Sequence, residues 1–277
     1  MNKVIAALDG LNISESSVDY AAYLAKNFNA YIVATFLEDI TYHQPRHEHK
    51  HLFTEWSEVE KLSEEEEEVR KTALHKIQSR FNKEGIKYNI HQDKIVAIQS
   101  LLNESYYADM VVIGAHEKFS NWDKSDPSHF IKELLAGSDC PVMLVPEVFT
   151  PIEKFIFCYD GSPSSIYAIK QFGYLFSVLP KHQVEILMVT DDQHSNHFPN
   201  QHYLKELLKQ KYSVVLQSVI KNSDTQKGMI DYLKTQSSNC MVVIGAYQRS
   251  TFSRWLNQSI ADTLISSLNI PIFIAHK

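Results

Sequence analysis

The stretch Met110-Val-Val-Ile-Gly-Ala115 occurs a second time in this chain, as Met241-Val-Val-Ile-Gly-Ala246. The two copies start at positions 110 and 241 of 277 residues. Each is an unbroken apolar run that stops at a glycine, which is typical of a strand buried on both faces of a parallel sheet. The repeat predicts that one fold occurs twice in the chain.

The same order of elements is expected around each copy. In the first half, strands are predicted at 3–9, 30–37, 86–91, 109–114 and 141–145, and helices from Ser14 and over 53–81, 95–106 and 126–136. In the second half, strands are predicted at 154–159, 184–190, 213–220, 241–245 and 271–275, and helices from Ser162 and over 203–208, 227–235 and 258–268. Strands that alternate with helices indicate α/β sandwiches with parallel sheets covered on both faces. We expect two such domains in tandem, each with five strands.

The domain boundary is predicted near position 150, which gives domains 1–149 and 150–277. Asp-Gly ends the first strand of each half, at Asp9 and at Asp160. These aspartates lie further apart than the two repeated glycines, Gly114 and Gly245, so the first half carries about 20 extra residues. We place them in an insertion at about 39–81, which combines a histidine-rich segment with an acidic helix.

The composition excludes several classes of protein. The net charge of −6 comes from one glutamate-rich window, 55–70, and no basic field exists to attract nucleic acid or anionic lipid. No apolar run approaches the roughly 20 residues that span a bilayer. The chain enters a strand-like run directly, without a signal-peptide pattern, so a cytoplasmic protein is expected. Its three cysteines, in apolar surroundings, are expected to be reduced core residues.

A strand that ends in Asp-Gly, followed later by Val-Val-Ile-Gly-Ala, resembles the universal stress protein family. Both halves carry these features, so the chain is similar to a tandem universal stress protein over nearly its whole length. The resemblance implies a Rossmann-like fold of the adenine-nucleotide alpha-hydrolase type. It also implies that the last strands, 142–145 and 272–275, pair and form an internal pseudo-dimer. Such pairing would remove two exposed sheet edges, which otherwise invite association.

The family's nucleotide-binding loop has the form G-x-x-G, nine residues, then G-[S/T]. Glycines allow backbone N–H groups to approach phosphate, and a helix N-terminus favours its charge. In the first half Gly114 and Ser128 match this pattern, whereas Glu117 and Pro127 replace glycines. A carboxylate at Glu117, a lost donor at Pro127 and an N-cap at Asp126 would oppose a polyphosphate. We expect a degenerate site, with Asp9 serving as a turn residue.

The second-half loop departs from the pattern without opposing charge. The candidate anion-binding or nucleotide-binding residues there are Asp160, Gly245, Gln248, Arg249, Arg254, Gln258 and Ser259. Glutamines stand where two of the family's glycines are expected, so close approach of a phosphate is disfavoured. ATP or another adenine nucleotide is retained as a possible cofactor of this half, beside the simpler interpretation that the arginines keep the loop soluble.

Four histidines, His43, His47, His49 and His51, crowd the insertion. The segment from His47 to His51 formally fits H-E-x-x-H, a zinc-site pattern that needs a helix with an apolar face. The segment is polar throughout, so a metallohydrolase is disfavoured and an exposed loop is expected, with zinc binding as the alternative.

The leading functional prediction is a non-enzymatic stress-response protein that acts by binding. One alternative is a nucleotide-dependent switch or slow ATPase that uses the second half. Another is a metal-responsive module built on the histidine-rich segment. The expected partners are the chain itself, through the pseudo-dimer and a further homodimer, and an unidentified protein or small molecule.

Overall fold

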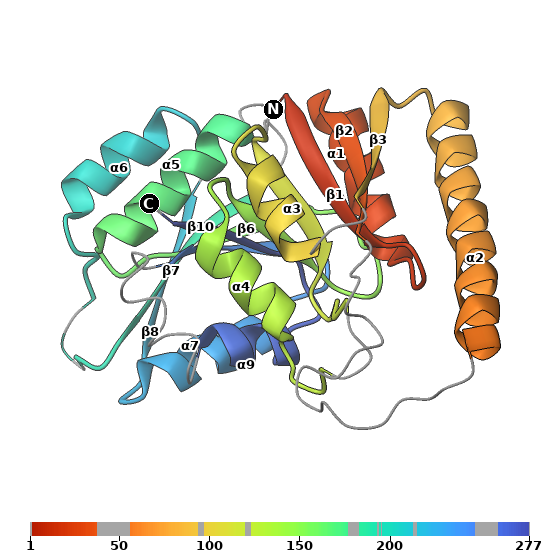
Figure 1. Ribbon diagram of the computed structural model, residues 1–277. Helices are drawn as coiled ribbons and strands as arrows, with labels where there is room; N and C mark the ends of the chain where they lie inside the picture. Colours follow the sequence, from red (N-terminus) through yellow and green to blue (C-terminus); the bar gives the residue numbers. More distant parts are fainter. Residues whose placement is uncertain are drawn as a thin grey trace.

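The computed structural model describes residues 2–37, 56–93, 97–119, 123–176, 183–192, 194, 196–212, 215–246 and 260–276. Strands and helices alternate along these segments (Figure 1). The first half contains β1 (Lys3–Asp9), α1 (Glu15–Phe28), β2 (Tyr31–Leu37), α2 (Trp56–Lys83), β3 (Tyr88–Asp93), α3 (Ala97–Ser105), β4 (Met110–Gly114), α4 (His129–Gly137) and β5 (Val142–Val145). The second half contains β6 (Lys154–Cys158), α5 (Pro163–Leu175), β7 (Gln183–Thr190), α6 (Gln201–Lys209), β8 (Val215–Lys221), α7 (Thr225–Lys234), β9 (Cys240–Ala246), α9 (Ile260–Ser267) and β10 (Ile272–His276).

All these strands belong to one sheet, in the order β3-β2-β1-β4-β5-β10-β9-β6-β7-β8. Pairing is parallel within each half and antiparallel at the junction, where Ile272 faces Leu144 and Ile274 faces Val142. The α/β class and the pairing of the two last strands are therefore confirmed. Each half contributes five strands, and the antiparallel junction joins them into a continuous ten-stranded sheet.

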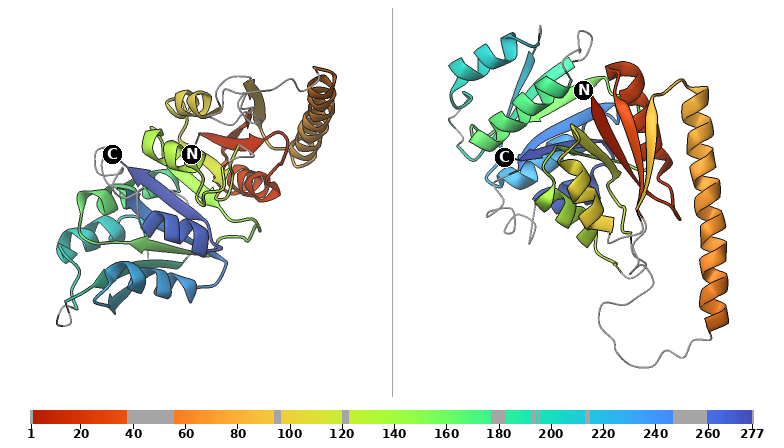
Figure 2. Two further views of the ribbon diagram at one scale, coloured as in Figure 1. Left: turned by 60° about the horizontal axis from the view of Figure 1, so that its bottom comes forward. Right: turned by 45° about the horizontal axis from the view of Figure 1, so that its top comes forward.

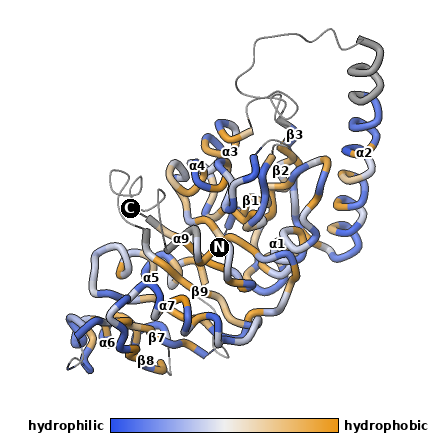
Figure 3. The backbone as a smooth tube through the Cα atoms, turned by 90° about the horizontal axis from the view of Figure 1, so that it is seen from below, coloured by the Kyte–Doolittle hydropathy of each residue, from blue (hydrophilic) through white to orange (hydrophobic). Residues whose placement is uncertain are grey.

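Helices cover both faces of this sheet, and each covered face holds its own hydrophobic cluster (Figure 2). Alternate residues of β1 divide between the clusters: Val4 and Ala6 face α1 and α2, whereas Ile5 and Ala7 face α3 and α4. In the second half, α5 and α6 cover one face, and α7 and α9 cover the other. Figure 3 shows that hydrophobic segments gather along the central strands.

Serine side chains cap the helices that follow β1 and β6. Ser14 Oγ accepts a hydrogen bond from the N–H of Ser17 at 3.2 Å, and Ser162 Oγ accepts one from Ser165 at 3.2 Å. Pro163 occupies the first turn of α5, where its missing N–H costs nothing. These helix starts agree with the sequence prediction.

The start of α4 differs from the prediction, because its N-cap is Ser128 and not Asp126. Ser128 Oγ accepts the N–H of Ile131 at 3.2 Å. The carboxylate of Asp123 accepts the N–H of His129 at 2.6 Å. These two side chains satisfy two of the free donors of the first turn, and the helix begins at His129 rather than at 126.

Along the chain, the long helix α2 connects β2 to β3. The much shorter α6 makes the corresponding connection, between β7 and β8, in the second half. Helix α2 contacts the core through Ala73, Ile77 and Phe81, near its C-terminal end. Val69, four residues before Ala73, is 48% exposed and lies outside this buried set. The N-terminal turns of α2 extend past the sheet (Figures 1 and 2).

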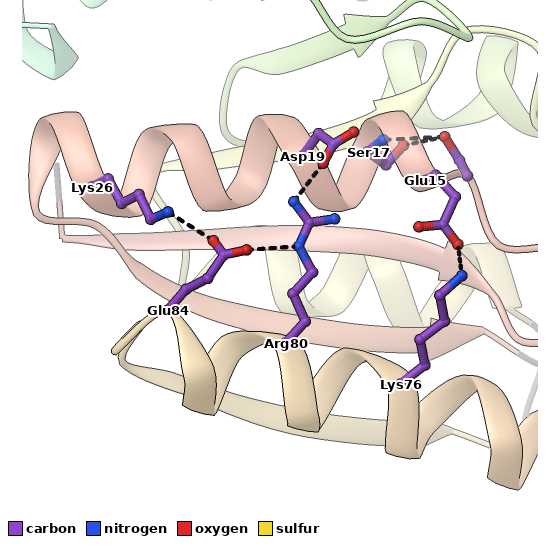
Figure 4. A network of polar contacts seen from close by, with 8 residues as sticks. Glu15, Ser17, Asp19, Lys26, Lys76, Arg80 and Glu84 are labelled. Carbon is purple, nitrogen blue, oxygen red and sulfur yellow. Dashed lines mark hydrogen bonds and ion pairs between the residues drawn. The ribbon is translucent and has the colours of Figure 1, made fainter.

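Ion pairs link α2 to α1 on the outer surface (Figure 4). Lys76 pairs with Glu15, Arg80 pairs with Asp19, and Glu84 accepts from Lys26 at 2.9 Å. These pairs join the C-terminal part of α2, which also carries the buried Phe81, to α1. Among the described residues, no helix is long and apolar enough to cross a membrane.

Candidate functional site

Each half has a cavity at the carboxyl ends of its strands, where parallel α/β sheets place ligand sites. The first-half cavity has a volume of about 320 Å³ and the second-half cavity about 170 Å³. The strands of the two halves run in opposite directions across the β5–β10 junction. The two cavities therefore open at opposite edges of the sheet.

The first-half cavity lies between the end of β4, the start of α1 and the end of β5. Its lining consists of Asn12, Ile13, Ser14, Glu15, Gly114, Ala115, His116, Glu117, Val145, Pro146 and Glu147. Gly114 and Glu117 were predicted members of this site, and the structure places them in contact.

Glu117 folds back over the end of β4. Its N–H donates to the carbonyl oxygen of Gly114 at 3.2 Å. A Cβ added to Gly114 would lie 3.0 Å from Glu117 Cγ, so the glutamate side chain occupies the space above this glycine. Only 9% of Glu117 is exposed. The side chain thus fills the position that a phosphate would need in order to approach the Gly114 backbone.

The charge of Glu117 differs from the sequence-based expectation. Burial, followed by repulsion from Asp9, raises the pKa of Glu117 to about 8. Its carboxyl is therefore mostly protonated at neutral pH. The sequence-based argument rested on the charge of Glu117, and the structure adds the bulk of its side chain over Gly114 as an obstacle to phosphate.

Asp9 and Asp160 both form turns with the residues that follow them. Asp9 Oδ1 accepts the N–H of Leu11 at 2.8 Å, and Asp160 Oδ1 accepts the N–H of Ser162 at 2.9 Å. Burial raises the pKa of Asp9. The pKa of Asp160 is also subject to burial, but hydrogen bonds from Ser162 and Ser165 outweigh it and lower the pKa. Asp160 is therefore an ionised group beside the second-half cavity.

Polar contacts hold together the two ends of the loop that follows β4, residues 116–117 and 126–128. Ser128 Oγ donates to the backbone carbonyl of Glu117 while it accepts from Ile131, so this hydroxyl is engaged on both sides. Asp126 Oδ1 lies 2.9 Å from His116 Nδ1. Pro127 is buried and lacks an N–H. The serine that matches the family pattern is thus used to close the loop.

The second-half cavity is enclosed by the ends of β6, β7 and β9 and by the start of α7. Its lining consists of Cys158, Tyr159, Asp160, Ser162, Ser165, Leu187, Val189, Thr225, Gln226, Met229, Ile244 and Gly245. Asp160 and Gly245, both predicted site residues, share this cavity. The wall from Thr225 to Met229 was not predicted, because nothing in that sequence distinguishes it from an ordinary amphipathic helix.

Gly245 has a packing role that the sequence did not reveal. A Cβ at this position would lie 2.2 Å from the backbone oxygen of Ser164, at the start of α5. Such an approach is impossible for a side chain, so β9 and α5 require glycine here. The other candidates of this half, Gln248, Arg249, Arg254, Gln258 and Ser259, lie outside the described residues.

The proposed metal ligands His43, His47, His49 and His51 also lie outside the described residues. Within the described part of the chain, no three His, Cys, Asp or Glu side chains converge as metal ligands would. The three cysteines are free thiols, as expected. Burial raises the pKa of Cys140 and of Cys240 to about 11, so these thiols are protonated at neutral pH and weakly nucleophilic.

The sequence of residues 1–146 matches the Universal stress protein family. The chain belongs to this family. No curated protein matches it. A solved structure of a universal stress protein from Archaeoglobus fulgidus DSM 4304 is similar over 99% of this chain and 98% of that one, with 15% identity and a TM-score of 0.70. A functionally unknown protein, PA1789 from Pseudomonas aeruginosa PAO1, is similar over 99% of this chain and 92% of its own, with 10% identity and a TM-score of 0.54.

The family match spans the first half, with its closed loop and Glu117 over Gly114. The structural similarities extend over both halves and, at these identities, concern the fold alone. Membership of the universal stress protein family therefore does not by itself give this chain a nucleotide site.

Proposed function

We propose that this chain is a tandem universal stress protein, with domains 1–149 and 150–277, that acts by binding and not by catalysis. In this proposal the first half holds no nucleotide in the usual manner of the family. The observation that carries it is the position of Glu117, whose side chain covers Gly114 at the end of β4.

The contacts of the loop support the same conclusion. Ser128, the residue that matches the family's phosphate-loop serine, donates to the Glu117 carbonyl and caps α4. A phosphate would have to displace both the Glu117 side chain and this hydrogen bond. The exchange would break the Ser128 hydrogen bond and the packing of the Glu117 side chain over Gly114.

Equilibrium dialysis of the full chain against Mg·ATP at neutral pH tests the proposal. We expect no stoichiometric binding at micromolar ATP. Asp9→Asn and Asp160→Asn form a matched pair, because both aspartates close equivalent turns after the first strand of their half. One ATP bound per chain, lost in the Asp9→Asn variant and kept in Asp160→Asn, would contradict the proposed role of the first half.

The second candidate function is a nucleotide-dependent switch in the second half. Its support is the second-half cavity, which has an apolar lining and an ionised aspartate, Asp160, beside Gly245. Loss of bound ATP in Asp160→Asn, with retention in Asp9→Asn, would favour this candidate over a chain without nucleotide. Phosphate release measured on the same samples would separate an ATPase from a switch.

A zinc-responsive role of the histidine-rich segment stays a separate proposal. Elemental analysis of the purified chain tests it directly, with a variant in which His47, His49 and His51 are alanine as the control. Zinc retained by the variant would exclude this segment as the site.

A further inference from the structure

We propose that the first-half cavity binds a small organic ammonium ion, with the carboxyl of Glu117 as its counter-ion. This inference rests on the proposed function only in treating the chain as a binding protein. It assigns a ligand class to a cavity whose residues disfavour the phosphate that the family pattern suggests.

The first argument is the lack of a partner for a buried polar group. Glu117 is nine-tenths buried and lines the cavity. Within the part of the chain that the structure describes, its carboxyl oxygens receive no hydrogen bond. Polar groups in largely buried positions are nearly always hydrogen-bonded, and the carboxyl of Glu117 faces the cavity without a protein donor among the described residues. A ligand that donates hydrogen bonds into the cavity would satisfy it.

The second argument is the sign of the surrounding charge. The ionisable residues that line the cavity are Glu15, Glu117, Glu147 and His116, and Asp9 adds a further carboxylate behind Glu117. His116 already contacts Asp126 at 2.9 Å, and Glu15 is paired with Lys76 outside the cavity. With Glu117 protonated and with Glu15 and His116 already paired, the remaining charge of the described lining at neutral pH is the carboxylate of Glu147, which favours a cation over an anion.

Among the described residues of the lining, the start of α1 would attract an anion, and it is already occupied. Ser14 Oγ accepts from Ser17, and Glu15 lies in the first turn, where a carboxylate offsets the positive end of the helix. Within the described residues, a metal ion has no set of three converging ligands here. An organic ammonium group needs only one carboxylate and neighbouring acceptors, and the site provides these.

The cavity has room for a molecule of this kind. Its volume of about 320 Å³ lies at the lower end of the range for small-molecule pockets. Pairing with an ammonium ion favours the ionised form of Glu117, whose pKa of about 8 reflects burial and Asp9. The ligand enters already protonated, so Glu117 loses one proton to the solvent when the pair forms.

Isothermal titration calorimetry of the full chain at pH 7 tests the inference with three probes of equal size. Benzylammonium, benzyl alcohol and benzoate carry a positive charge, no charge and a negative charge. We expect one benzylammonium site per chain, at least about tenfold weaker binding of benzyl alcohol, and no binding of benzoate. Repeating the titration in two buffers of different ionisation enthalpy should show the release of close to one proton.

Glu117→Gln is the decisive variant, because glutamine keeps the shape of the side chain and removes its charge. We expect it to lower benzylammonium affinity by about tenfold or more and to abolish proton release. Glu206→Gln, on the exposed surface of α6, is the matched control and should bind like the parent. The charge series and the proton count on the parent chain remain decisive should Glu117→Gln fold poorly.

Three results would overturn the inference: equal binding of benzoate, undiminished binding by a folded Glu117→Gln, or no saturation with benzylammonium up to about 10 mM. None of them bears on ATP. The dialysis experiment with Asp9→Asn and Asp160→Asn therefore tests the proposed function separately.

Discussion

Gly114 and Gly245 end identical six-residue stretches but meet different neighbours. Above Gly114 lies a flexible side chain, that of Glu117. Against Gly245 lies the backbone of Ser164 and Ser165, at the first turn of α5. Gly114 is thus covered by a side chain, whereas the close approach of the α5 backbone requires a glycine at position 245.

Gly245→Ala should destabilise the protein by about 2–3 kcal/mol, since a Cβ would overlap backbone that cannot move without shifting α5. Gly114→Ala is the control and should cost less than about 1 kcal/mol, because the Glu117 side chain has to shift only slightly to make room for a Cβ. Urea unfolding followed by circular dichroism measures both. Equal costs for the two substitutions would refute the different roles of the two glycines.

Glu117 should make stability depend on pH. Its folded pKa of about 8 exceeds its usual value of 4.5, so between these values the folded state keeps a proton that the unfolded state has lost. The contribution of this proton to the free energy of unfolding has its full value below pH 4.5 and is lost as the pH rises through 8. Glutamine does not titrate. Between pH 5 and pH 8 we therefore expect the free energy of unfolding of Glu117→Gln to rise relative to that of the parent chain by on the order of 2–3 kcal/mol.

Unfolding in urea at several pH values checks this prediction. The exposed Glu206→Gln supplies the baseline, because loss of its exposed i,i+4 pair with His202 should change the free energy of unfolding by less than about 1 kcal/mol. Parallel curves for the parent and Glu117→Gln would show that Glu117 is ionised in the folded protein.

At the scale of elements, α2 shows how a helix is held by its core contacts more than by its ion pairs. Phe81 is fully buried, and the centroid of its ring lies 5.3 Å from the ring centroid of Tyr88. Arg80, the next residue, pairs with Asp19 and Glu84 on the surface, where its side chain is 30% exposed. Burial of the aromatic ring contributes far more than screened surface charges do.

Phe81→Ala should cost about 3–5 kcal/mol, the usual result of truncating a buried aromatic residue. Arg80→Met, which keeps the apolar stem, should cost about 0.5–1 kcal/mol and less in high salt. Chemical denaturation in urea at low and high sodium chloride measures both effects. A larger loss from Arg80→Met would mean that the ion pairs of Figure 4 anchor the helix.

Strands and helix starts were predictable from the sequence where neighbouring residues alone determine them. The buried strands are continuous apolar runs, and Ser14 and Ser162-Pro163 are strong helix starts, so these features agree with the structure. The cap of α4 was misplaced because Asp126, Ser128 and Asp123 are all good acceptors, and only tertiary geometry selects among them. Short-range patterns do not contain that information.

The candidate sites were only partly predictable for the same reason. Asp160 and Gly245 share one cavity as expected from the carboxyl ends of neighbouring strands. The protonation of Glu117 was missed, because burial of a polar side chain depends on contacts between segments remote in sequence. The contribution of α7 to the second-half cavity was missed because its residues carry no distinctive chemistry.

At the scale of the whole molecule, the two halves together form one structural unit. The β5–β10 junction is almost completely buried, and each hydrophobic cluster contains residues of both halves. The connecting segment is tied to α1, since Tyr20 Oη donates to the carbonyl of Thr150 at 3.2 Å and Tyr23 Oη to that of Ile152 at 3.3 Å. From these contacts we expect the two halves to unfold together.

Differential scanning calorimetry should therefore show a single unfolding transition. Phe81→Ala in the first half and Gly245→Ala in the second should each lower the temperature of that one transition. Two transitions, with each substitution moving only one, would show that the halves unfold independently.

The antiparallel junction also bears on how the two cavities can change. In a dimer of identical chains, every substitution enters both sites at once. Here two unlike halves are covalently joined, and their cavities open at opposite edges of one sheet. An altered residue such as Glu117 therefore reshapes one end of the molecule alone, and selection can act on each end separately.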